Sequence, residues 1–96
     1  MKQSGWSENE VSLFHFRDNR KNEVDIVLEQ SDGNIIGIEV KASSTINERD
    51  FKRLRVLSDF TGEKFTQGVV LYTGQNILPF RFDNKQYFAI PIQLFF

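Results

Sequence analysis

Two strand-like stretches separated by a short turn signal constrain the fold of this chain more than any other feature. They are Glu23–Gln30 and Ile35–Ser43, with Ser31-Asp32-Gly33 between them. The first stretch alternates polar and apolar residues, which is typical of a β-strand with one buried face, and Asp-Gly between two such runs favours a hairpin. The sequence therefore predicts an antiparallel pair whose register decides which side chains share a face.

The length of the turn selects between two registers of this hairpin. A two-residue turn at Asp32-Gly33 pairs Asp25 with Val40 and mixes apolar and charged residues on both faces. A three-residue turn with Gly33 at positive φ pairs Asp25 with Glu39 instead, and we favour it because it sorts the faces cleanly. One face then holds Val24, Ile26, Leu28, Ile36, Ile38 and Val40, and the other holds Glu23, Asp25, Val27, Glu29, Gly37, Glu39 and Lys41.

An aromatic-rich segment before the hairpin, Val11–Arg17, is predicted to be a further strand, joined to the hairpin by a polar turn. A five-residue loop sets His15 opposite Asp25 and Arg17 opposite Glu23. The three strands then form an antiparallel meander. On the first strand the apolar face takes Phe14 and Phe16, and the charged face takes Leu13, His15 and Arg17.

A helix is predicted after the meander. Thr45 with Glu48, or Asn47 with Asp50, fits a cap for its first turn, and Gly62 fits its end. These signals leave the choice between the two caps open. The apolar stripe of the helix is expected to consist of Phe51, Leu54, Leu57 and Phe60.

The dense apolar run within Phe65–Tyr72 predicts a buried fourth strand. It is expected to lie parallel to the third strand, because a strand–helix–strand crossover in one sheet is nearly always right-handed. A short fifth strand at the sheet edge is expected near Gln86–Ile90, followed by a docking turn.

The predicted register brings two carboxylates together. Asp25 and Glu39 would be about 5 Å apart at Cβ, and their repulsion reaches about 3 kcal/mol at an effective dielectric near 20. Mg²⁺ or Mn²⁺ between them would offset this cost, because such ions take hard oxygen ligands. Lys41, on the same side, would hold a phosphate or stabilise developing negative charge. Metal-assisted phosphodiester hydrolysis uses these groups.

Cross-strand ion pairs account for the same pattern without a metal. Alternating charges are common on solvated strand faces. In that interpretation the cations His15, Arg17 and Lys41 neutralise the acids Glu23, Asp25 and Glu39. The residues alone leave both interpretations open.

The two strands of the hairpin carry a familiar pattern. Glu23–Glu29 and Gly37–Ser43 resemble the core of the PD-(D/E)xK phosphodiesterase superfamily, with Val24 in place of its leading Pro. The chain also resembles, over residues 6–96, the C-terminal domain of unknown function that follows the ATPase module in many prokaryotic AAA-type ATPases. The segments that carry this second resemblance are Leu13–Asp18, Arg49–Leu54, Gly68–Tyr72, Leu78–Phe80 and Ala89–Pro91.

The resemblance implies a restriction-endonuclease-like mixed α/β sheet. It matches Asp25 and Glu39 to the metal-binding acids, Lys41 to the catalytic lysine, and Glu23 to an acid of the ATPase-associated family. The predicted sheet, rather than the resemblance, places His15 and Arg17 beside these residues as supporting groups. Superfamily members place a helix before the first strand, whereas only residues 1–10 precede Val11 here. We therefore expect a flexible segment at 1–10 and a single truncated domain over 1–96. A Gly-x-x-x-x-Gly-Lys-Ser/Thr loop does not occur, so this sequence is not itself the ATPase.

Composition limits the remaining options. The 96 residues suffice for one domain, and the absence of Cys excludes disulfides and Cys-ligated zinc. The first ten residues have no apolar signal core and no apolar run reaches membrane-spanning length, so a cytoplasmic protein is expected. The net charge of −1 provides no overall attraction to nucleic acid.

Two hypotheses for function follow. The first is a Mg²⁺- or Mn²⁺-dependent nuclease domain, in which a basic patch contacts nucleic acid. The second is a non-catalytic nucleic-acid or protein interaction domain attached to an ATPase. The same patch can also be an ordinary solvated helix face, without contact to nucleic acid. In either case we expect a homodimer, or parent ATPase sequence, to cover exposed apolar surface. The patch consists of Arg49, Lys52, Arg53 and Arg55.

Overall fold

The computed structural model describes residues 12–17, 19 and 23–95. The segment predicted to be flexible (1–10), the start of the first strand at Val11 and most of the turn at 18–22 lie outside these residues. The elements are the strands β1 (Ser12–Arg17), β2 (Glu23–Glu29), β3 (Ile35–Val40), β4 (Phe65–Tyr72), β5 (Leu78–Phe82) and β6 (Lys85–Pro91), the helix α2 (Lys52–Thr61), and the 3₁₀ turns η1 (Glu48–Phe51), η2 (Gly62–Lys64) and η3 (Ile92–Phe95).

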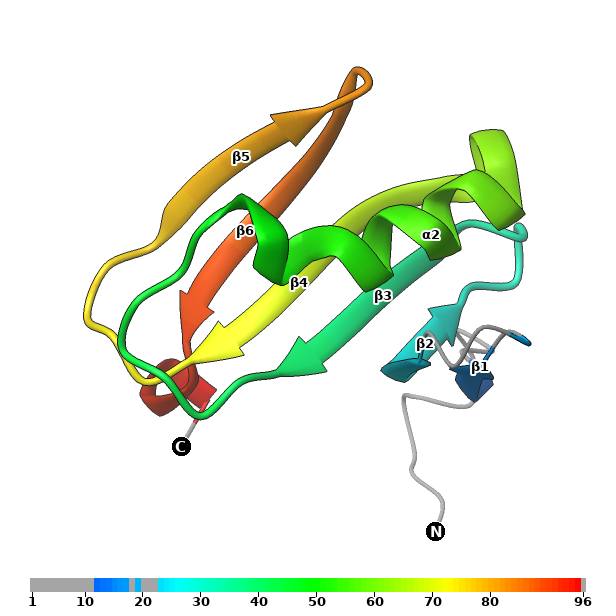
Figure 1. The fold of residues 1–96 in the computed structure, drawn as a ribbon. Coiled ribbons are helices and arrows are strands. Elements are labelled where there is room, and N and C mark those ends of the chain that lie inside the picture. The colour runs from blue at the N-terminus through cyan, green and yellow to red at the C-terminus, as the bar shows by residue number, and fades with distance from the viewer. Residues whose placement is uncertain (1–11, 18, 20–22, 96) are drawn as a thin grey trace, which may run out of the picture.

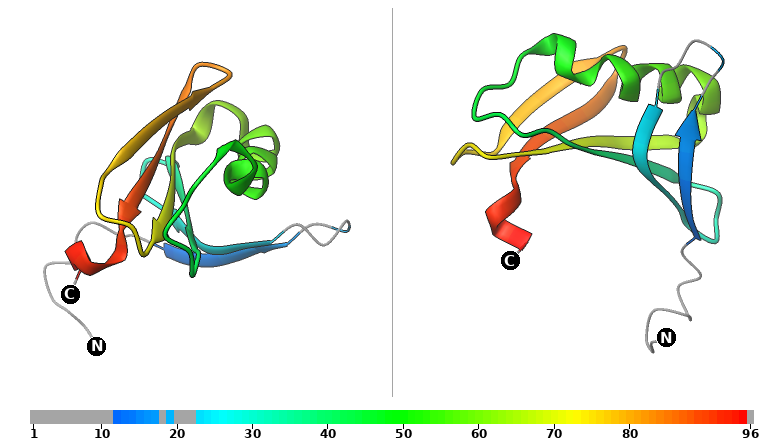
Figure 2. Two further views of the ribbon diagram at one scale, coloured as in Figure 1. Left: turned by 60° about the vertical axis from the view of Figure 1, so that its left-hand side comes forward. Right: turned by 60° about the horizontal axis from the view of Figure 1, so that its bottom comes forward.

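The strands form one six-stranded mixed sheet in the order β1-β2-β3-β4-β6-β5 (Figure 1). The β1–β2, β2–β3 and β5–β6 pairs are antiparallel, whereas β3–β4 and β4–β6 are parallel. The sheet curls around α2, which lies against one of its faces (Figure 2). The predicted α/β class, the antiparallel meander and the parallel fourth strand are therefore confirmed. None of the described helices is long and apolar enough to cross a membrane.

The prediction for the C-terminal part was wrong in one respect. The strand expected at the sheet edge near Gln86–Ile90 is β6, which lies inside the sheet between β4 and β5. The edge strand is β5, which the sequence analysis missed. Asp83 and Asn84 join the two strands with φ values of 53° and 67°, as a tight hairpin turn requires. Pro79 is compatible with β5 because an edge strand does not need every backbone N–H.

The predicted register of the β2–β3 hairpin is confirmed. Ile26 pairs with Ile38 and Glu29 with Ile35, as a three-residue turn requires. Gly33 has a φ of 90°, a backbone conformation that is strained for any residue with a side chain. This register continues toward Asp25 and Glu39 at the open end of the hairpin.

The pairing of β1 with β2 is interrupted by a bulge. Phe14 pairs with Val27, but Phe16 pairs with Val24, so one residue of β1 faces two residues of β2. Because the bulge shifts the side-chain alternation, Val24 and Val27 are both buried in the core. Arg17 pairs with Glu23, as predicted.

The bulge corrects the predicted sorting of side chains into two faces. Val24 was expected beside Ile26 and Leu28, yet Val24 is buried under α2 while Ile26 is 37% exposed. Phe14 and Phe16 were expected on the face of Ile26, but they pair with the two buried valines. Leu13, assigned to the charged face, pairs with Leu28. Strict alternation of side chains along β2 does not predict these positions. The bulge inserts one extra residue, so the residues on one side of it point to the opposite face from the one that alternation predicts.

The contact between α2 and the sheet positions the third strand. Phe51, Leu54 and Leu57 are buried as predicted, whereas Phe60 is 76% exposed with its ring 5.5 Å from that of Phe16. A Cβ at Gly37 would lie 2.7 Å and 2.9 Å from the Cδ2 atoms of Leu54 and Leu57. Gly37 therefore lets α2 approach β3 closely, on the face that Glu39 shares by strand alternation.

Large apolar side chains remain exposed among the described residues. They come from β1, β2, β3, α2, η3 and the loop before β5, as is common in a small domain whose core buries only part of the apolar surface. Exposed apolar groups of this kind tend to mark interfaces when they are contiguous. The most exposed are Leu13, Phe14, Ile26, Val40, Phe60, Ile77 and Leu94.

Candidate metal and phosphate site

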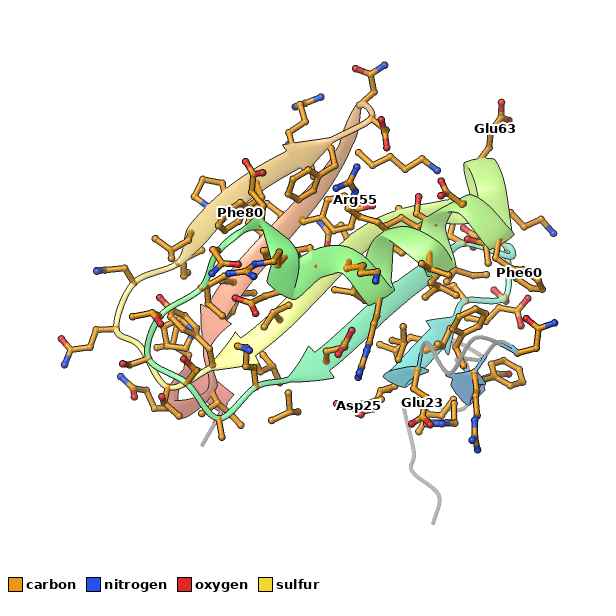
Figure 3. All side chains as sticks on the ribbon, viewed as in Figure 1. Glu23, Asp25, Arg55, Phe60, Glu63 and Phe80 are labelled. Atoms are coloured by element: carbon orange, nitrogen blue, oxygen red, sulfur yellow. The ribbon has the colours of Figure 1, made fainter. Side chains whose placement is uncertain are left out.

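The side chain of Asp25 is hydrogen-bonded to the backbone of β3. Its Oδ2 accepts a hydrogen bond from the backbone N–H of Val40 at 3.0 Å. Asp25 itself is exposed, next to the bulge in β2 (Figure 3). The bond holds the carboxylate of Asp25 beside Glu39, the residue that precedes Val40 in β3.

Glu39 is the most unusual carboxylate of the described structure. Its Oε2 atom is buried, and no hydrogen-bond partner reaches that atom among the described residues. Burial raises the pKa of Glu39 from 4.5 to about 7; the Arg53 charge opposes this rise and the Asp25 charge adds to it. The positive charge of Lys41 also opposes the rise in the pKa of Glu39, and the negative charge of Asp50 adds to it. Because a buried polar atom without a partner is costly, this oxygen is suited to a proton or a cation.

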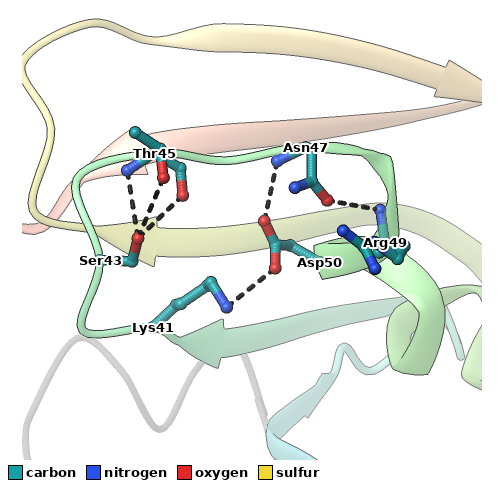
Figure 4. A network of polar contacts seen from close by, with 6 residues as sticks. All are labelled: Lys41, Ser43, Thr45, Asn47, Arg49 and Asp50. Atoms are coloured by element: carbon teal, nitrogen blue, oxygen red, sulfur yellow. Dashed lines mark hydrogen bonds and ion pairs between the residues drawn. The ribbon is translucent and has the colours of Figure 1, made fainter.

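Lys41 is paired with an acid that the sequence analysis treated only as a helix cap. Its Nζ lies 2.9 Å from Oδ1 of Asp50 (Figure 4). The other oxygen of Asp50 accepts the backbone N–H of Asn47 at 2.8 Å, and Asn47 in turn caps the turn η1. Burial raises the pKa of Asp50, but the hydrogen bonds from Lys41 and Asn47 outweigh burial, so its pKa lies below the usual value.

This arrangement decides between the two predicted helix caps. Asn47 with Asp50 forms the reciprocal capping box, whereas Thr45 bonds to Ser43. The cap therefore brings Asp50 back over the end of β3, to Lys41. The spacing of Asn47 and Asp50 was visible in the sequence, but the approach of Lys41 depends on the path of residues 41–47.

The residues predicted to support the site form a group of their own. Glu23 lies 3.4 Å from Nε of Arg17 and 3.7 Å from Nε2 of His15. His15 was predicted opposite Asp25, but the bulge sets it against both Asp25 and Ile26. The charges that act most strongly on Glu39 come instead from α2, η1 and the neighbouring strand ends.

The predicted basic patch is divided between two sides of the helix. The positive charge of Arg53 lowers the pKa of Glu39. Arg55, by contrast, lies 3.7 Å from Asp83 and 4.6 Å from the ring centroid of Phe82. Residues two apart on a helix point about 200° apart, which separates these two arginines. Lys52 is exposed, and Arg49 lines a shallow hollow with Asn47 and Glu48. The four cations therefore do not form one surface.

The acids of this region do not by themselves make a three-ligand metal cage. Within 12–17, 19 and 23–95, no group of three or more His, Asp or Glu side chains is close enough to hold a metal ion. A cation here would be held by Asp25 and Glu39, with water completing its coordination, as is common for Mg²⁺.

Fold and site together define a small mixed α/β domain with an acid pair and a lysine at the end of its central strands. Residues 1–95 match the family described as a domain of unknown function, DUF4143. The match spans almost the whole chain, so this protein belongs to that family. Searches of curated proteins and of solved structures gave no match.

Proposed function

We propose that this chain is a nuclease-like phosphodiesterase domain of the PD-(D/E)xK type that depends on Mg²⁺ or Mn²⁺. The main observation in support is that the buried Oε2 of Glu39, near Asp25, has no hydrogen-bond partner in the part of the chain that the structure describes. A purely structural glutamate would pair this atom with a donor, because an unmade hydrogen bond costs about 1–3 kcal/mol. Two further parts of the proposal are a restriction-endonuclease-like core and a parent AAA-type ATPase of which this domain is the C-terminal part.

The donor set of the site fits a hard divalent cation. Asp25 and Glu39 offer carboxylate oxygens, and such oxygens with water are the ligands that Mg²⁺ prefers. Because the pKa of Glu39 is about 7, a large fraction of its carboxyl group carries a proton near neutral pH. A bound cation would replace that proton, since ligands must be deprotonated to coordinate. When bound, the metal would supply a Lewis acid for the phosphoryl group.

Lys41 and Arg53 have different roles in the proposed function. Lys41 has an ammonium group on a half-exposed side chain, and this group can donate to a phosphoryl oxygen as negative charge develops there. Arg53, from α2, adds positive charge near Glu39. Both groups favour an anionic substrate at the same end of β3.

Metal-dependent cleavage tests this function. Supercoiled DNA and a single-stranded RNA are incubated with the protein in Mg²⁺, in Mn²⁺ and in EDTA. We expect nicking that requires the metal and is lost in Lys41→Ala, while Lys64→Ala, which removes an exposed lysine from η2, retains it. Cleavage that survives in EDTA, or equally in Lys41→Ala, contradicts the proposal.

A second candidate is a non-catalytic interaction domain attached to an ATPase. The observation in its favour is the exposed apolar set, which includes Leu13, Phe14 and Phe60. A second copy of the chain, or sequence of the parent ATPase, would cover these side chains. Metal binding by the wild type without cleavage of either nucleic acid would favour this candidate.

A further inference from the structure

The ion pair between Lys41 and Asp50 joins the end of β3 to the start of the helix. Lys41 follows β3 directly, whereas Asp50 lies in η1, after an intervening loop. Their 2.9 Å separation is that of a charge-assisted hydrogen bond, which is about twice as strong as a neutral one. The pair is thus the polar link between the lysine of the proposed site and α2.

Asp50 is held more firmly than Lys41. Its side chain is 12% exposed, against 42% for Lys41. Its Oδ2 is fixed by the backbone N–H of Asn47 at 2.8 Å, and this leaves Oδ1 aimed at the ammonium group (Figure 4). A rigid acceptor opposite a flexible four-carbon side chain determines where the lysine nitrogen lies.

We propose that Asp50 is a positioning residue of the site, which holds the ammonium of Lys41 near Glu39 and ready for a phosphoryl oxygen. An ammonium group has three N–H donors, and the bond to Asp50 uses one of them. Two donors therefore remain for a phosphate oxygen while the lysine stays in place. The catalytic meaning of this role rests on the proposed function, but the positioning itself does not.

The chain offers a matched pair of variants that separates positioning from capping. Asp50→Asn keeps an oxygen to accept the Asn47 N–H but removes the charge that binds Lys41. Asn47→Ala removes the side-chain cap on Arg49 N–H but keeps its own backbone N–H for Asp50. If Asp50 only caps the helix, Asn47→Ala is expected to be the more damaging of the two substitutions. If Asp50 positions Lys41, Asp50→Asn is expected to be the more damaging.

The primary measurement is the NMR signal of the Lys41 side-chain ammonium, observed with ¹⁵N-labelled protein at low temperature and assigned by its absence in Lys41→Ala. We expect a distinct, slowly exchanging signal in the wild type and in Asn47→Ala, and its loss in Asp50→Asn. If Asp50→Asn does not fold, Asp50→Ser serves instead, because a serine hydroxyl also accepts the Asn47 N–H. An unchanged Lys41 signal in the charge-free variant, or its loss in Asn47→Ala as well, overturns the inference.

A second measurement uses cleavage in Mg²⁺. Loss of positioning is expected to lower the rate of Asp50→Asn by roughly up to 100-fold, with that of Asn47→Ala close to wild type. The two measurements distinguish the two claims. A wild type that does not cleave, but whose Lys41 signal depends on Asp50, refutes the nuclease function and leaves the positioning role supported.

Discussion

The carboxylate of Asp25 accepts the backbone N–H of Val40 at 3.0 Å. This one bond crosses from β2 to β3 beyond the last pair of the regular hairpin, Ile26 with Ile38. It brings a negative charge next to Glu39, whose pKa is already raised by burial. Two carboxylates are therefore kept close together, and a cation bound between them would offset their mutual repulsion.

Replacing Glu39 with Gln should stabilise the fold at high pH. The pKa of Glu39 is raised from 4.5 in the unfolded chain to about 7, so the folded protein binds more protons between these values. Stability is then fully present below pH 4.5 and is lost as pH rises through about 7. We expect Glu39→Gln to be more stabilising at pH 8 than at pH 5, by about 2 kcal/mol after allowance for solvent screening.

Urea unfolding without divalent metal, followed by circular dichroism at the two pH values, measures this difference. Glu63→Gln is the control, because Glu63 is exposed in η2. An effect of Glu39→Gln that is the same at both pH values would show that the carboxylate is not desolvated.

Gly37→Ala should loosen the contact between α2 and the sheet. The new Cβ would lie within 3 Å of side-chain carbons of Leu54 and Leu57, which are both buried. Overpacking of this kind costs about 1–3 kcal/mol. The free energy of unfolding in urea tests this prediction against Ser44→Ala, a change in an exposed loop that should have little effect. Equal stabilities of the two variants would contradict the packing described for β3.

Gly33→Ala should weaken the hairpin that sets the register of the site. A residue with a side chain pays about 1–2 kcal/mol for a left-handed conformation, and Gly33 has a φ of 90°. Gly33→Asn should cost less, because Asn tolerates positive φ better than Ala. Thermal unfolding of the three proteins should therefore rank Gly above Asn above Ala, and any other order would argue against the bulged turn.

The register of the hairpin was predictable from the sequence, whereas the bulge next to it was not. The period of two sorts Ile26, Ile36 and Ile38 onto one face in only one register, and Gly33 supplies the turn which that register needs. The bulge depends on α2, since it places Val24 and Val27 under the same helix. Such a tertiary preference leaves no mark on the local alternation of side chains.

The strand β5 and the contact between Lys41 and Asp50 were also not predicted from the sequence. In β5, Leu78, Phe80 and Phe82 alternate with Pro79 and Arg81, but a Pro within a run argues against a strand, and the turn at Asp83-Asn84 lacks the glycine that usually marks a hairpin. The contact of Lys41 with Asp50 joins residues on either side of a loop, so their spacing in sequence does not predict it. The hairpin register that directs Asp25 toward Glu39 was predicted correctly, but the charged groups that surround Glu39 were not.

Stabilisation of the fold by Mg²⁺ or Mn²⁺ is the measurement that tests the proposed cation site most directly. A ligand that binds only the native state at 100 times its Kd adds about 2.7 kcal/mol to the free energy of unfolding. We expect the wild type and Asp59→Asn, which alters an exposed helical acid, to gain stability with metal at pH 8. Asp25→Asn, which keeps an acceptor for Val40 but loses the charge, should show no gain. No gain in the wild type, or an equal gain in Asp25→Asn, would contradict the metal site and with it the proposed function.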